Sequence, residues 1–237
     1  MPAKNAIKTY VENGYYHIYN RGVDKRLIFQ DGQDYAVFRS YLKEYLQPKD
    51  EVALSRKAAD LKIPAKEKNK ILRSLQLNNY SQHINLLAYT LMPNHFHFFL
   101  KQKSPDAIGK FMSSLCTRYS TYFNRKYNRT GALFQGVYKA VLIDNEAQYI
   151  HISRYIHHQA ISAYEDSPDQ PSSYPEYISQ RSTDWVHPEE IMALFPGPGS
   201  AAAYAKFVAE YQPSTFTGRV LKGESLGATS NSLSSPA

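Results

Sequence analysis

Hydrophobic residues recur along the first two thirds of the chain with two different spacings. Alternating or nearly continuous apolar runs, which are typical of strands, cover 15–20, 84–91, 95–100 and 136–143. Apolar residues three and four apart, which are typical of helices, cover 32–46, 107–127 and 145–161. The order β-α-β-β-α-β, followed by one more helix, predicts an α+β fold with a ferredoxin-like split βαβ antiparallel sheet.

The segments that connect these elements contain residues typical of turns and helix caps. Met92, Pro93 and Asn94 separate the two middle strands and predict a short turn, and either Asp144 or Asn145 is a suitable cap for the last helix. A sheet of this kind carries helices on one face. We expect the other face to remain open.

The remaining segments differ in composition from this central part. We assign residues 12–165 to a main domain and read the charged residues at about 48–81 as an insertion with one or two small helices. Residues 166–211 form a C-terminal extension with short helices. Residues 212–237 are mostly Ser, Gly, Thr and Ala, which predicts a disordered tail.

Composition narrows the classes of protein. A single cysteine, Cys116, excludes a disulfide framework or a cysteine-based zinc site within one chain. The sequence shows neither a signal-peptide pattern nor an apolar run that approaches a membrane span, so we expect a cytoplasmic protein with no membrane partner. From Lys68 to Lys139 there are eleven Lys or Arg and one acidic residue, Asp106. Such a basic region favours a polyanionic partner, most often nucleic acid, although an uneven solvated surface remains the alternative.

The segment "LMPNHFHFFL" places two histidines, His95 and His97, in an apolar strand. Side chains two apart on a strand face the same way, so both imidazoles lie on one face, with Phe96 and Phe98 on the other. This spacing lets both rings reach one metal ion. Two half-exposed histidines without an ion remain the alternative interpretation.

The last predicted helix carries Tyr155 and Gln159 four residues apart, on one helical face. The Gln159 amide oxygen can coordinate a hard cation, and the Tyr155 hydroxyl would then lie beside it. His151 lies one turn earlier and His158 lies next to this face. Taken alone, the pair is equally consistent with a polar surface stripe.

Together these motifs resemble the HUH single-strand endonucleases and, more closely, the single-tyrosine HUH transposases, including the REP-associated tyrosine transposases. The similarity covers roughly residues 12–165 and rests on "YYHIYNRG", "LLAYTLMPNHFHFFL", "GALFQGVYKAVLI" and "YIHISRYIHHQAI". Gln159 is similar to the insertion-sequence members, whereas the long C-terminal region is more like the REP-associated members. The resemblance implies that 12–165 is the catalytic domain and that the helix at 145–161 is its extra catalytic helix.

The resemblance also implies residue roles and a reaction. Tyr155 would be the nucleophile, and His95, His97 and Gln159 would hold Mg²⁺ or Mn²⁺. The expected activity is that of a transposase that cuts single-stranded or hairpin DNA through a 5′-phosphotyrosine intermediate. One tyrosine per protomer means that two cleavages need two protomers or two sequential events, which makes a homodimer consistent with the sequence. The basic residues expected to contact DNA are Arg21, Lys25, Arg26, Arg118, Arg125, Lys126, Arg129 and Lys139.

Two other functions fit part of the pattern. One is a domesticated HUH protein that binds DNA without transposition. The other is a non-enzymatic RNA-binding module of the RRM type, which shares the β-α-β-β-α-β order and stacks bases on sheet aromatics. In the DNA-cutting interpretation, exposed aromatics such as Tyr16 or Tyr19 would stack on unpaired bases of the substrate. The chain lacks the RRM signature, and an RRM has no need for a trailing helix with Tyr155 and Gln159.

Overall fold

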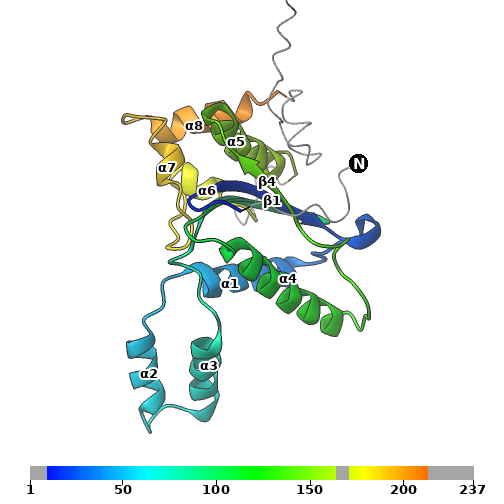
Figure 1. Ribbon diagram of the computed structural model, residues 1–237, viewed down its shortest axis with the longest axis vertical. Helices are drawn as coiled ribbons and strands as arrows, with labels where there is room; N and C mark the ends of the chain where they lie inside the picture. Colours follow the sequence, from blue (N-terminus) through cyan, green and yellow to red (C-terminus); the bar gives the residue numbers. More distant parts are fainter. Residues whose placement is uncertain (1–9, 164–170, 213–237) are drawn as a thin grey trace, which may run out of the picture.

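The computed structural model describes residues 10–163 and 171–212 and is built around a four-stranded antiparallel sheet (Figure 1). The strands lie in the order β2-β3-β1-β4, and all neighbouring pairs are antiparallel. Their bounds are β1 (Tyr15–Arg21), β2 (Ile84–Met92), β3 (His95–Gln102) and β4 (Lys139–Ile143). This is the order of a split βαβ sheet, so the predicted fold class is confirmed.

Two helices, α1 (Gly32–Leu46) and α4 (Ala107–Lys126), pack on one face of this sheet (Figure 1). Phe96 and Phe98 of β3 point into this layer and join the same buried core as both helices. The predicted apolar stripe of α4 is buried, with Tyr122 only half-buried at its margin. The spacing of three and four residues therefore identified the inward face of α4 correctly.

The opposite face of the sheet is covered as well, so the expectation of an open face is wrong. Helices on this side are α5 (Glu146–Ala163), α6 (Tyr174–Tyr177), α7 (Glu189–Met192) and α8 (Ser200–Ala209). A second core forms between them and the sheet around Leu87, Phe99 and Ile156. Its physical cause is that β2 and β3 carry bulky apolar side chains on both faces, and both faces must then be shielded from water.

The C-terminal extension also binds to the sheet along its edge strand, β2, through backbone hydrogen bonds and a ring contact. The amide of Leu91 donates to the Pro171 carbonyl, and the amide of Ser173 donates to the Tyr89 carbonyl. Further along, the Trp185 ring stacks on Tyr89 at a centroid distance of 5.6 Å. This extension is therefore an integral layer of the described fold.

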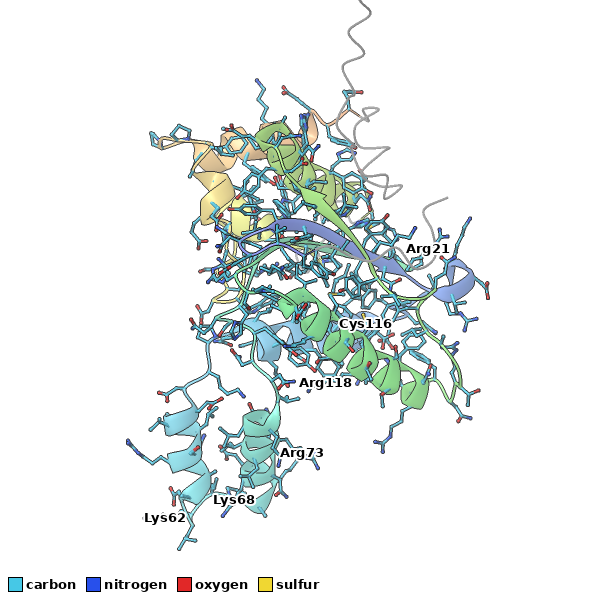
Figure 2. All side chains as sticks on the ribbon, in the orientation of Figure 1. Arg21, Lys62, Lys68, Arg73, Cys116 and Arg118 are labelled. Atoms are coloured by element: carbon cyan, nitrogen blue, oxygen red, sulfur yellow. The ribbon has the colours of Figure 1, made fainter. Side chains whose placement is uncertain are left out.

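The charged insertion forms two helices, α2 (Glu51–Ala59) and α3 (Ala65–Gln76), as predicted. They pack on each other as a hairpin that projects from the main body (Figure 1), with Ala58 and Ile71 buried between them. Figure 2 shows Lys62, Lys68 and Arg73 on this projection, far from the sheet.

A tight loop supports the β2–β3 hairpin. Gly22 follows β1, and its amide donates to the Asn94 carbonyl at 2.9 Å. A Cβ atom on Gly22 would lie 2.2 Å from the Arg26 carbonyl oxygen, so only glycine fits this approach. The loop then returns through a short 3₁₀ turn, η1 (Val23–Lys25), to the hairpin tip. The strand β4 begins at Lys139, three residues later than predicted. The predicted tail from 213 onward lies outside the described residues.

Candidate active site

The two histidines of β3 lie on the sheet face that α5 covers. In the antiparallel register His95 is opposite Arg21 of β1, and His97 is opposite Tyr19. Their rings are 5.0 Å apart, while Phe96 and Phe98 are buried in the other core. The prediction that both imidazoles share one face is confirmed. The expectation that they lie on an open face is wrong for His97, which is only 3% exposed.

Helix α5 brings Tyr155 and Gln159 to the same place. The helix starts where Asn145 accepts a hydrogen bond from the Gln148 amide at 2.9 Å, and buried Ile152 and Ile156 fix its inner face against the sheet. The Tyr155 ring meets the His97 ring edge-on at a centroid distance of 5.4 Å. The Gln159 side-chain amide donates a hydrogen bond to the Tyr155 hydroxyl.

Each ring nitrogen of His95 lies within hydrogen-bond distance of a side-chain amide oxygen. Its Nδ1 lies 2.6 Å from Asn94 Oδ1, and its Nε2 lies 3.2 Å from Gln159 Oε1. Both partners are oxygen acceptors, because the amide nitrogens of Asn94 and Gln159 donate elsewhere. A neutral imidazole has one N–H, and the shorter contact to Asn94 favours Nδ1 as its place. In that tautomer the lone pairs of His95 Nε2 and Gln159 Oε1 face each other.

Two facing lone pairs are a suitable binding position for a cation. Burial lowers the pKa of His95, the contact with Gln159 opposes this shift and the charge of Arg21 assists it, so the net effect favours the neutral ring, which is the form that can bind a metal ion. Burial also lowers the pKa of His97, with smaller effects from His17 and His95. A divalent metal ion fits this donor set of two imidazoles and one amide oxygen. Within the described residues no group of three His, Cys, Asp or Glu side chains is placed to hold a metal ion, so the amide is needed for a third protein ligand.

Tyr155 is nearly enclosed at this position. Its side chain is 7% exposed and contacts His97, His17 and Tyr211 through ring edges or tilted rings. Burial raises the pKa of the Tyr155 hydroxyl, and the hydrogen bond from Gln159 acts in the opposite direction. The arrangement therefore holds the Tyr155 hydroxyl beside the Gln159 amide, whose oxygen faces His95.

The predicted DNA-contacting residues fall on two sides of the sheet. Arg21 and Lys139 are exposed on the same face as His95, since Lys139 pairs with Tyr19 across β1 and β4. The Arg21 guanidinium donates to Gln135, and the Lys139 ammonium lies 6.0 Å from the Tyr19 ring centroid. These two residues form the basic margin of the candidate site.

Lys25, Arg26 and Arg129 lie in loops near the hairpin tip or the end of α4. Lys25 is exposed in η1, and Arg26 pairs with Asp24 at 3.8 Å. Arg129 donates to Asn124 at 2.9 Å. The Lys25 carbonyl accepts a hydrogen bond from the Asn94 amide at 3.3 Å, and Asn94 in turn contacts His95.

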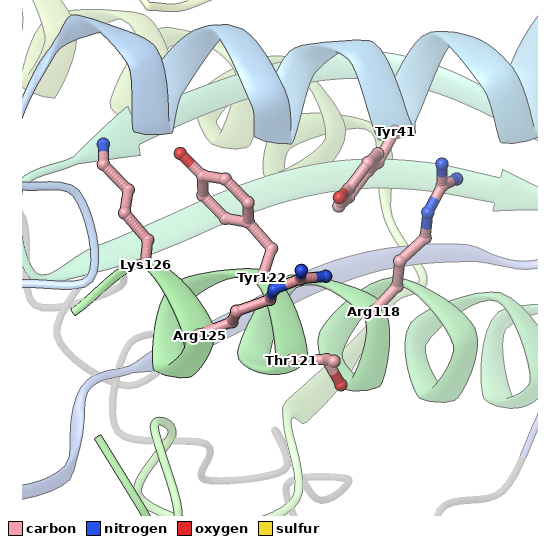
Figure 3. A pocket seen from close by; sticks show the side chains of 6 residues that line it. All are labelled: Tyr41, Arg118, Thr121, Tyr122, Arg125 and Lys126. Atoms are coloured by element: carbon pink, nitrogen blue, oxygen red, sulfur yellow. The ribbon is translucent and has the colours of Figure 1, made fainter. Parts of the chain in front are cut away.

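Arg118, Arg125 and Lys126 lie in the helical layer on the other side of the sheet. They line a hollow between α1 and α4 together with Tyr41, Thr121 and Tyr122 (Figure 3). Arg118 pairs with Glu44 at 2.8 Å, and Lys126 pairs with Asp31 and the fully buried Asp34 at 2.7 Å each. Figure 2 likewise separates Arg118 in this layer from Arg21 at the end of β1. The sequence did not reveal that Arg118 and Lys126 are already paired with carboxylates.

Other aromatic and histidine predictions have mixed outcomes. Tyr16 was expected on an exposed surface, which is wrong: it is 1% exposed in the core beneath the sheet, because it alternates with His17 along β1. Tyr19 is half-buried on the candidate-site face. The His151 ring contacts Phe207 and the His158 ring contacts Tyr211.

Two residues in the cluster were not recognised from the sequence. His17 lies on β1 and forms a 2.8 Å hydrogen bond with His97, and Asn94 binds His95. A usable signal for His17 was its place in an apolar strand that pairs with the His-containing strand. For Asn94 the signal was its position immediately before His95 in the hairpin turn.

The fold and this cluster define an α+β protein with a split βαβ sheet and a His-, Gln- and Tyr-containing site on one face. The family described as "Transposase IS200 like" matches residues 61–159. The matched segment is similar to the IS200-like transposases, and it includes His95, His97, Tyr155 and Gln159. No curated protein sequence matches the chain.

Three solved structures resemble the chain, each with 14% sequence identity. The REP-associated tyrosine transposase bound to a REP hairpin has a TM-score of 0.46, covering 77% of this chain and 91% of its own. A proposed transposase from Deinococcus radiodurans R1 has a TM-score of 0.34, with 65% and 97% covered. The tRNA(His) guanylyltransferase from Saccharomyces cerevisiae has a TM-score of 0.32, with 90% and 86% covered. At these scores they carry no functional argument.

None of the helices in the described ranges is both long enough and apolar enough to span a membrane.

Proposed function

We propose that the protein is a metal-dependent single-strand DNA endonuclease and strand transferase, that is, a transposase that cuts hairpin-bearing DNA through a 5′-phosphotyrosine intermediate. The single observation that carries the proposal is the convergence of His95 Nε2 and Gln159 Oε1 at 3.2 Å, with the Tyr155 hydroxyl hydrogen-bonded to the same Gln159 amide. The Gln159 side chain would therefore bind the cation through its oxygen and hold the nucleophile through its amide nitrogen.

Each protein group has a defined task in this reaction. The three ligands His95, His97 and Gln159 are neutral, so they do not cancel the charge of a bound cation. Mg²⁺ or Mn²⁺ held there would polarise a phosphate oxygen and favour ionisation of the neighbouring hydroxyl. Gln159 would orient the Tyr155 oxygen by donating to it and would stabilise its negative charge as the proton leaves.

Tyr155 would then attack phosphorus and displace the 3′-oxygen. The upstream fragment leaves with a 3′-OH, and the downstream fragment remains attached to Tyr155 through its 5′-phosphate. Attack by another 3′-OH on this phosphotyrosine would regenerate Tyr155 and join the strands. The two exchanges conserve the phosphodiester bond, so no nucleotide cofactor is needed.

The substrate class follows from the shape and charge of the site. Tyr155 and the histidines lie between a sheet face and α5, where a flexible single strand enters more easily than a duplex. Exposed Arg21 and Lys139 at the margin would bind flanking phosphates, and half-buried Tyr19 between them would stack on an unpaired base. With one Tyr155 per protomer, a homodimer would supply the second nucleophile for two-ended strand exchange.

Other tyrosines on this side are less suited to attack. Tyr149 lies one and a half turns earlier on α5, and its ring packs edge-on against Tyr15 and Phe99. Burial also raises the pKa of its hydroxyl. It lacks the Gln159 hydrogen bond and the adjacent pair of histidines that distinguish Tyr155.

The test is cleavage of end-labelled hairpin DNA with a single-stranded flank, in Mg²⁺ or Mn²⁺ and in a chelator. The proposal predicts a free 3′-OH fragment and a protein-linked 5′ fragment that survives denaturing electrophoresis, both only with the cation. Tight binding without any cleavage or adduct across varied single-stranded flanks would instead favour a domesticated DNA-binding protein. Preferential binding of single-stranded RNA without cleavage would favour the RNA-binding alternative.

A further inference from the structure

A second histidine pair lies directly beneath the candidate metal position. His17 Nε2 and His97 Nδ1 are 2.8 Å apart, and the two ring planes are nearly parallel, with an interplanar angle of 14° and centroids 5.0 Å apart. Both side chains are buried, and His17 is fully so. The proposed reaction assigns a role to His97 but leaves His17 without one.

One hydrogen atom lies between these two nitrogens. Whether it is bonded to His97 or to His17 determines whether His97 can bind a cation. When His97 Nδ1–H donates to His17 Nε2, the His97 Nε2 atom carries a lone pair and can bind a cation. When His17 Nε2–H donates to His97 Nδ1, the neutral His97 carries its hydrogen on Nε2 and cannot. Metal binding through His97 Nε2 therefore requires His17 to be the acceptor.

The packing around His17 does not by itself account for an imidazole. Its other nitrogen, Nδ1, is buried and has no hydrogen-bond partner among the described residues. A buried polar atom without a partner disfavours folding, whereas an apolar side chain of similar size would avoid that penalty. Within the ranges 10–163 and 171–212, the one polar contact of the His17 side chain is the bond to His97.

The geometry points to His17 as a positioning residue for His97, an inference that rests on the proposed metal-dependent function. We infer that His17 accepts the Nδ1–H of His97 and so fixes the tautomer and ring orientation that present His97 Nε2 to the cation. His17 is not a ligand itself, because its Nε2 is engaged by His97 and its Nδ1 is buried. Partners of this kind, which hold a ligand without touching the metal, have measurable effects on affinity.

The first experiment measures Mn²⁺ affinity of the full chain by electron paramagnetic resonance, without DNA and without an activity readout. His17→Leu removes the acceptor and is expected to weaken Mn²⁺ binding by about 10- to 100-fold. His17→Gln keeps a side-chain oxygen that can accept from His97 Nδ1, and it should restore most of the affinity.

A matched control exists in the same core. His157 is also fully buried, and its two ring nitrogens bind Tyr204 at 2.7 Å and Ser173 at 2.8 Å, with no contact to His97. Burial lowers its pKa to about 3, as it does for His17. His157→Leu should lower thermal stability but leave Mn²⁺ affinity within about twofold of wild type.

The second experiment reads the tautomer directly and needs no variant. In ¹⁵N-histidine-labelled wild-type protein with Mg²⁺, nuclear magnetic resonance should show His97 protonated at Nδ1, with a scalar or exchange-detected link to His17. Pulsed electron paramagnetic resonance of the Mn²⁺ form should detect nitrogens from two histidines. These readouts decide the case even if His17→Leu does not fold.

The outcomes separate the inference from the function on which it rests. Wild-type Mn²⁺ binding that persists unchanged in folded His17→Leu overturns the role of His17 and leaves the metal site standing. A third coordinated histidine, or His97 protonated at Nε2 in the Mg²⁺ form, also overturns it. Failure of the wild type to bind Mn²⁺ or Mg²⁺ overturns both the metal site and the role of His17.

Discussion

The division of basic residues between the two sides of the sheet makes a quantitative prediction about DNA binding. Arg21 and Lys139 are exposed beside the His95 cluster, and neither forms an ion pair with a described carboxylate. Arg118 and Arg125 lie on α4 across the sheet, where Arg118 is already paired with Glu44. We therefore compare the double variant Arg21→Gln/Lys139→Gln with Arg118→Gln/Arg125→Gln, which removes the same formal charge.

The expected magnitude follows from counterion release. Each phosphate contact on a single strand contributes about 0.7 to the slope of log affinity against log salt, so losing two contacts should reduce the slope by about 1.4. At about 0.15 M salt this corresponds to roughly a tenfold loss of affinity. The Arg118→Gln/Arg125→Gln pair acts only through long-range attraction, which is largely screened at this salt, and should change the slope by less than about 0.3.

Fluorescence anisotropy of a labelled hairpin with a single-stranded flank, titrated at salt concentrations from about 0.05 to 0.3 M, measures both slopes. The reasoning is refuted if the α4 variant loses the larger slope while Arg21→Gln/Lys139→Gln binds like wild type. That result would place the main DNA contacts on the helical layer and detach them from the candidate active site.

Three further predictions concern the site and the fold. His95→Ala and His97→Ala should each abolish cation-dependent cleavage while DNA affinity stays within about threefold, since affinity resides mainly in phosphate contacts; normal cutting by both variants would show that the metal assignment is wrong. Lys126→Met leaves the buried Asp34 carboxylate without its cation and should lower stability by about 2–3 kcal/mol, or roughly 4–12 °C in Tm, with DNA affinity unchanged; an unaltered melting curve would contradict this structural role. Burial raises the pKa of Tyr155, so the rate of adduct formation should increase with pH between about pH 6 and 9, and a flat single-turnover profile would mean that its ionisation does not control the reaction.

Local patterns in the sequence were sufficient for most of the sheet and its first helical layer. The alternation His95-Phe96-His97-Phe98 gave the two faces of β3 correctly, because strand geometry fixes which side each residue occupies. The i,i+4 spacing of Tyr155 and Gln159 likewise gave their common face, and their hydrogen bond confirms it.

The second helical layer was not predicted, although β2 contained a hint of it. The run Leu86-Leu87-Ala88-Tyr89 has no polar alternation, which is typical of a strand buried on both faces. What covers the second face is set by contacts distant in sequence, such as Ser173 with Tyr89, and no local periodicity encodes these.

Pairing partners across the fold were equally hard to foresee. Lys126 reads as a solvent-exposed basic residue at the end of a helix, yet Asp31 and Asp34 meet it from α1 and its cap. His17 reads as one more residue of an aromatic strand, and only the β1–β3 register brings it to His97. Charge and residue type are local properties, whereas the partner that defines a residue's role is a property of the tertiary fold.

The identity of the DNA-linked residue tests the central claim most directly. Wild-type protein is incubated with a single-stranded hairpin substrate and Mn²⁺, and the covalent product is digested and sequenced by mass spectrometry. The account predicts a 5′-phosphotyrosine at Tyr155, its loss in Tyr155→Phe with folding and hairpin binding retained, and its persistence in Tyr149→Phe. An adduct on any other residue, or an undiminished adduct in Tyr155→Phe, would contradict it.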